Sequence, residues 1–167
     1  MRFLLCNTHP LVDSPPRKWF SESQLVSILL KDFPFGELDG RITHLNLDEP
    51  FGCLIEVHAC VKHFSAGIEV CYHTPQSKIL ALGLIAGLAS LQLPVPVQLC
   101  RRSWFSSCHA GLRMAQEHPH VSVDLCGKHD ERTIAWLHNP QALAAIRVGL
   151  FTGMQWYQDR EEQLHVA

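Results

Sequence analysis

The segments IEVHACVK, residues 55–62, and IEVCYH, residues 68–73, decide the predicted fold. In each segment apolar side chains alternate with polar side chains or cysteines, which is the period of a strand with one buried face. A short stretch that ends in Gly67 separates them, so we expect the two strands to pair as an antiparallel hairpin. Matching their buried faces places Val61 opposite Val70.

This pairing also brings four residues that bind zinc in other proteins onto one face of the hairpin. His58 would lie opposite His73, and Cys60 opposite Cys71, all on the side away from the core. Two imidazoles and two thiolates are a ligand set for zinc. The competing interpretation is that cysteine serves here as a small apolar residue, because four ligands on one flat patch form a tetrahedron poorly. The hairpin therefore gives two hypotheses, a zinc cofactor or no cofactor.

Helices are predicted on either side of the hairpin. A capping box predicts a helix over residues 21–32. The next predicted helix, residues 76–91, is apolar nearly all round, as a helix is when most of its sides are buried. Gly83 and Gly87 lie four residues apart on one of its faces, where they would let another backbone approach closely.

Shorter signals give the remaining elements. We predict strands over residues 3–6, 41–47, 97–100 and 121–125, and helices over residues 107–117, 130–137 and 140–163. Asp130 caps the second of these helices, and Asn139 before Pro140 caps the third. The last helix carries one apolar stripe, made of Leu143, Ile146, Leu150, Met154 and Tyr157.

Composition limits the class of protein. A chain of 167 residues is long enough to bury a core and is expected to form one domain, residues 1–167. Hydrophobic residues make up 47% and charged residues 18%, which excludes a disordered chain. The formal net charge of -2 provides no overall basic field for nucleic acid.

The seven cysteines include no pair at the spacing CxxC, which favours reduced thiols and a cytoplasmic location. The most apolar stretch, residues 79–91, is well short of the roughly 20 residues that cross a bilayer, so no membrane contact is expected.

The predicted fold class is α+β, a single domain with a mainly antiparallel sheet, a β-hairpin, a buried central helix and a long C-terminal helix. Over residues 3–125 the order of elements resembles the N-acetyltransferase fold of the GNAT type, and a ferredoxin-like core with an added hairpin has the same elements. The first resemblance implies that coenzyme A would bind at the turn over residues 73–81. Gln76 stands where that family often has Arg or Gln, whereas glycine is absent from the turn and first appears at Gly83.

No catalytic or nucleotide-binding motif occurs in the chain. The leading hypothesis is therefore an interaction or assembly module without catalysis, which binds a protein partner or itself. Its predicted contact residues are Phe151 and Trp156, which lie off the apolar stripe of the last helix. The alternative is a small transferase-like enzyme that binds acyl-CoA or a similar ligand at the end of the sheet.

A third hypothesis is an accessory protein that binds nucleic acid. Arg101 and Arg102 stand next to Trp104 at the end of a predicted strand, where phosphate and a base could be bound together.

Two cysteines are weaker candidates for chemistry. Cys108 begins a predicted helix, where a thiol becomes more acidic, and Cys126 lies three residues from His129.

Overall fold

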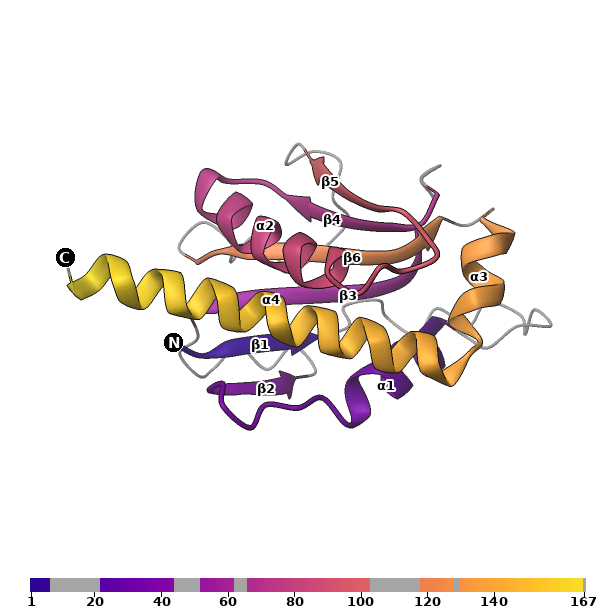
Figure 1. Cartoon of the computed structure of the whole chain (residues 1–167), viewed down its shortest axis with the longest axis horizontal. Coiled ribbons are helices and arrows are strands. Elements are labelled where there is room, and N and C mark those ends of the chain that lie inside the picture. The colour runs from indigo at the N-terminus through magenta and orange to yellow at the C-terminus, as the bar shows by residue number, and fades with distance from the viewer. Residues whose placement is uncertain (7–21, 44–51, 62–65, 103–117, 128–129, 167) are drawn as a thin grey trace.

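The computed structural model describes residues 1–6, 22–43, 52–61, 66–102, 118–127 and 130–166. Within these ranges six strands form one sheet in the order β2-β1-β3-β6-β4-β5 (Figure 1). The strands are β1 (Phe3–Cys6), β2 (Gly40–Thr43), β3 (Cys53–Val61), β4 (Ile68–Tyr72), β5 (Val97–Arg101) and β6 (His120–Gly127).

The sheet is mainly parallel. β1 runs parallel to β2 and β3, β3 runs parallel to β6, and β4 runs parallel to β5, whereas β4 and β6 are antiparallel. The predicted mainly antiparallel sheet is therefore wrong, and so are the GNAT-like and ferredoxin-like orders. A mixed α/β sheet takes their place.

The predicted hairpin is also wrong, because β6 lies between β3 and β4. Val123 of β6 pairs with Val57 on one side and with Val70 on the other. The chain does reverse after β3, but the two strands stand two strand spacings apart, about 10 Å. Alternation of side chains determines which face of a strand is buried and leaves its neighbours open. All eight residues of β6 are buried, as expected for a strand with a partner along each edge.

Four helices are described: α1 (Glu22–Lys31), α2 (Pro75–Ala89), α3 (Glu131–Leu137) and α4 (Pro140–Val166). All four predictions are confirmed to within three residues at each end. The helix predicted at residues 107–117 lies outside the described residues, as does the second half of the strand predicted at residues 41–47. No described helix is long and apolar enough to cross a membrane.

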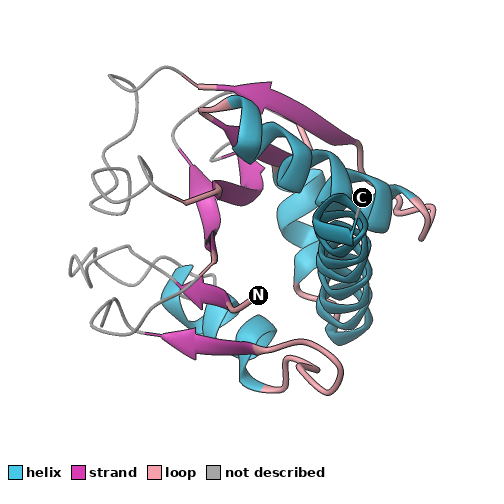
Figure 2. Ribbon diagram, turned by 90° about the vertical axis from the view of Figure 1, so that its left-hand side faces the viewer, coloured by secondary structure: helices cyan, strands magenta, loops and turns pink. Residues whose placement is uncertain are grey.

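The helices build the core on one face of the sheet. α2 and α4 lie there side by side (Figure 2), and α1 packs against β3 and α4. The apolar stripe predicted for α4 is buried along its whole length. α2 is buried toward the sheet and toward α4, but Leu82 on its outer side is 42% exposed. The prediction that α2 is buried on most sides is therefore wrong for its outer side.

Glycines set the distance between α2 and α4. A Cβ atom on Gly87 would lie 2.1 Å from the carbonyl oxygen of Gly149, and one on Gly153 would lie 2.5 Å from that of Gly83. These are backbone atoms that a rotamer change cannot move. The close approach predicted at Gly83 and Gly87 is confirmed, and its partners are Gly149 and Gly153.

Asp130 holds together two parts of the chain, and its removal should weaken the fold. Oδ1 accepts a hydrogen bond from the backbone N of Thr133 at 3.1 Å and caps α3, while Oδ2 accepts one from the N of Gly67 at 2.7 Å, just before β4. We expect Asp130→Ala to lower the free energy of unfolding by about 2 kcal/mol in urea titrations, more than the ~1 kcal/mol of an ordinary cap. Asn139, which caps only its own helix through the N of Gln141, is the matched control.

The effect of Asp130→Ala should also depend on pH. Burial would raise the pKa of Asp130, but the hydrogen bonds from Thr133 and Gly67 outweigh it and lower this pKa. A carboxyl whose folded pKa is lowered stabilises the protein above its unfolded pKa, about 3.9, and this contribution disappears as the pH falls through the folded value. The difference between wild type and Asp130→Ala should therefore shrink below about pH 4. A difference that stays constant well below about pH 4, in a chain that is still folded there, would contradict the role of the ionised carboxylate.

Candidate active site

The face of the sheet opposite α2 and α4 is polar at its centre. Strand pairing places His58 of β3 beside Asp124 of β6, and Asp124 beside Glu69 of β4. We call this surface the polar face. The polar and cysteine residues that form it lie in or next to β3, β4 and β6. They are Glu56, His58, Glu69, Cys71, His73, Arg102, His120, Ser122 and Asp124. Toward β1 the same face becomes apolar, with Leu4, Cys6 and Leu54 in contact.

Glu56 lies between two histidines. Its Oε2 is 3.4 Å from Nε2 of His58, and its Oε1 is 3.5 Å from Nε2 of His120, with all three side chains essentially buried. Burial raises the pKa of a carboxyl, but the hydrogen bonds and charges of the two histidines outweigh it, so the pKa of Glu56 falls well below its usual range. Glu56 is therefore a buried carboxylate that orients two imidazoles. The ring of His120 in turn stacks on that of His73, with centroids 5.9 Å apart.

Asp124 is the second buried carboxyl of the polar face. Its Oδ2 contacts Nη2 of Arg102 and accepts a hydrogen bond from the Cys71 thiol at 3.8 Å. Its Oδ1 is buried and accepts no hydrogen bond from the described residues. Burial raises the pKa of Asp124, against the opposing charges of Arg102 and His58. One oxygen is thus fixed in place, while the other keeps its full capacity to accept a hydrogen bond.

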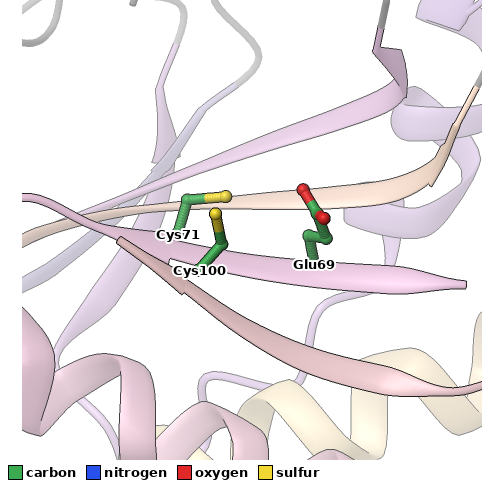
Figure 3. A group of neighbouring side chains, drawn as sticks. All are labelled: Glu69, Cys71 and Cys100. Atoms are coloured by element: carbon green, nitrogen blue, oxygen red, sulfur yellow. The ribbon is translucent and has the colours of Figure 1, made fainter. Parts of the chain in front are cut away.

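Two thiols and a carboxyl group lie next to Asp124. Ligand atoms of Glu69, Cys71 and Cys100 all lie within 4.8 Å of one another. The three side chains stand on the same side of β4 and β5, with the two sulfur atoms adjacent (Figure 3). Glu69 Oε2 is also 3.6 Å from Nη2 of Arg102. Among the described residues, this is the group of His, Cys, Asp or Glu side chains whose geometry suits a metal ion.

The structure separates the four residues of the predicted zinc set. His58 pairs with Asp124, Cys60 pairs with Cys126, and Cys71 pairs with Ser122. The predicted pairs His58 with His73 and Cys60 with Cys71 are wrong, because β6 lies between their strands. Of the four, His58, Cys71 and His73 are buried.

The other predicted site residues have varied surroundings. Phe151 is partly buried and meets Phe33 edge to face at 6.4 Å. Trp156 is 40% exposed and covers Gly83, with the Arg160 guanidinium 5.6 Å from its ring. Arg101 is exposed, and the Arg102 side chain, only 8% exposed, points into the polar face. Trp104, Cys108 and His129 lie outside the described residues, and Cys126 donates to the carbonyl of Ala59 at 2.8 Å.

The prediction from sequence missed Glu56, His120 and Asp124. A signal for them was present, because Ser122 and Asp124 alternate with the valines and leucine of β6, as Glu56 and His58 alternate with the apolar residues of β3. Carboxyls in the middle of strands are rare unless they are paired or functional. Reading residues 55–62 as a strand with only one buried face concealed this signal in β3.

Comparison with known proteins gives a fold match. The chain resembles the N-acetylmuramoyl-L-alanine amidase of Clostridium difficile 630, with a TM-score of 0.70, 13% identity, and 95% of this chain and 96% of that chain covered. It also resembles the catalytic domain of the amidase CwlV from Bacillus (Paenibacillus) polymyxa var. colistinus, with a TM-score of 0.66, 15% identity, and coverage of 95% and 99%. No family model and no curated protein sequence matches the chain.

At these identities the match establishes the fold. The neighbours include catalytic domains of amidases, which contradicts the predicted interaction module without catalysis. Protein partnering is nevertheless compatible with this fold, because another neighbour is the CwlD amidase from Clostridioides difficile in complex with the GerS lipoprotein.

Proposed function

We propose that this protein is a hydrolase that cleaves the amide bond between N-acetylmuramic acid and L-alanine. The observation that carries the proposal is the buried Asp124 carboxylate. One of its oxygens is held by Arg102, and the other has no partner among the described residues. The amidase fold, matched over 95% of the chain, supplies the class of bond.

Asp124 would act as the general base. Its raised pKa makes it a stronger proton acceptor than an exposed aspartate, while Arg102 keeps it ionised and fixes its orientation. Oδ1 accepts a proton from water as the water oxygen adds to the amide carbonyl. The same proton then passes to the leaving amine as the carbon–nitrogen bond breaks, which restores the carboxylate and leaves one acid and one amine.

His58 is the residue that we propose would hold a zinc ion. The chemistry of the site fits zinc, because a buried carboxylate, Glu56, faces Nε2 of His58 and favours the tautomer with its lone pair on Nδ1. Metal-binding histidines are commonly oriented by such a carboxylate. When bound, zinc polarises a carbonyl and makes water more acidic. Asp124, the direct strand partner of His58, would be the base that serves this centre.

The test is incubation of the purified chain with a muramoyl-L-alanine peptide in the presence of Zn²⁺. We expect a new free α-amino group on L-alanine, detected by amine labelling and mass spectrometry. A chelator should abolish its formation, and added Zn²⁺ should restore it. His58→Ala should form the product at least about 100-fold more slowly, because a metal ligand is lost. The proposal is wrong if the folded wild type with Zn²⁺ releases no amine.

A further inference from the structure

We propose that Glu69, Cys71 and Cys100 form a second metal site, specific for a thiophilic divalent cation such as Zn²⁺. It is separate from the proposed centre at His58, because its ligands come from β4 and β5. The inference rests on three observations, which concern the arrangement of the ligands, their access to solvent and the charges around them.

Strand pairing explains the arrangement of the ligands. β4 and β5 are parallel, and Cys71 is the direct partner of Cys100, so the two side chains leave the sheet on the same side. Glu69 lies two residues before Cys71 and therefore on the same face. The three ligand atoms lie within 4.8 Å of one another (Figure 3). Small changes of rotamer would bring them to zinc at about 2.3 Å for sulfur and 2.0 to 2.2 Å for oxygen.

Access to solvent differs among the ligands. Cys71 is buried, whereas Glu69 and Cys100 are partly exposed, and Cys100 belongs to the edge strand β5. An ion can therefore reach the site past these two side chains. Three protein ligands leave the fourth tetrahedral position for water or another small ligand, as in open zinc sites.

The local charges suit a divalent cation. Binding would convert both thiols to thiolates, with their two protons released to solvent. Two thiolates and the Glu69 carboxylate then face the two charges of the ion. Arg102 lies 3.6 Å from Glu69 and also contacts Asp124, so it offsets part of the negative charge of these carboxylates and the thiolates. Thiolate ligands favour zinc over calcium or magnesium.

The experiment uses Co²⁺ as a spectroscopic substitute for zinc in the whole, reduced, metal-free chain. We expect one equivalent of Co²⁺ to produce a sulfur-to-cobalt charge-transfer absorption, and Zn²⁺ to displace it. Cys100→Ser, at a partly exposed position that should tolerate the change, should weaken Co²⁺ binding about 100-fold and lose at least half of the absorption. Glu69→Gln should keep the absorption but bind about 10-fold more weakly.

Two control variants keep this test independent of the proposed function. Cys126→Ala removes a thiol outside the site and should leave the absorption unchanged. His58→Ala should also keep it, even though it should slow hydrolysis at least about 100-fold. The proposal is overturned if wild type shows no thiolate absorption, or if folded Cys100→Ser shows as much as wild type. Loss of the absorption in His58→Ala would place the metal elsewhere and equally overturn it.

Discussion

Asp124→Asn should reduce amide hydrolysis about 1000-fold, mainly through kcat, with KM nearly unchanged. A positioned general base contributes roughly 100-fold to 10,000-fold, and an amide of the same shape cannot accept the proton. Because the substitution keeps an oxygen that Arg102 can contact, substrate binding should survive. The rate of free amine release at saturating substrate gives kcat, and the rate at substrate concentrations well below KM gives kcat/KM.

Asp39→Asn is the matched control for this substitution. Asp39 is a carboxylate on the surface, 60% exposed and 3.2 Å from Arg2, so the same chemical change there should leave hydrolysis within twofold of wild type. Circular dichroism should show both variants folded. If folded Asp124→Asn kept more than a tenth of the wild-type kcat, Asp124 would not be the base.

The largest effect on stability is expected from Gly87→Ala. The added methyl group would lie 2.1 Å from the carbonyl oxygen of Gly149 and 2.6 Å from the nitrogen of Gly153, so α2 and α4 would have to move apart. Overpacking costs typically 1 to 3 kcal/mol, and a clash with backbone belongs at the upper end, about 3 kcal/mol. For a chain of this size the melting temperature should fall by about 10 °C. Alanine has a higher helix propensity than glycine, so the expected loss of stability would occur even though helix propensity favours the substitution.

Gly36→Ala shows what the same change does without a neighbour. No atom lies within 4 Å of a Cβ built on Gly36. We expect its free energy of unfolding to stay within about 0.5 kcal/mol of wild type. A Gly87→Ala variant as stable as Gly36→Ala in thermal and urea unfolding would show that the two helices can separate at little cost.

Local elements were predictable from the sequence, whereas strand order was not. The capped start of α3 at Asp130, the extent of α4 and the small-residue face of α2 depend on residues close together in the chain. The position of β6 between β3 and β4 depends on pairing between distant segments, and alternation carries no information about it.

The candidate site was harder to predict for the same reason. His58 and Cys71 were recognised as residues suited to metal chemistry, but their neighbours were assigned from a hairpin that does not form. Asp124 and His120 reach the polar face only through the position of β6. The ligand group at Cys100 likewise requires β5 to pair with β4, which no short-range pattern indicated.

The place of β6 also has a consequence for the order of folding. Before residues 120–127 are synthesised, β3 and β4 lack the strand that joins them, so β2-β1-β3 and β4-β5 are two half-sheets with unpaired inner edges. Such edges pair readily with other chains. Contacts between segments this distant in sequence also form slowly. Completion of the sheet and assembly of the polar face are therefore one late event, and a chain shortened before His120 would have neither.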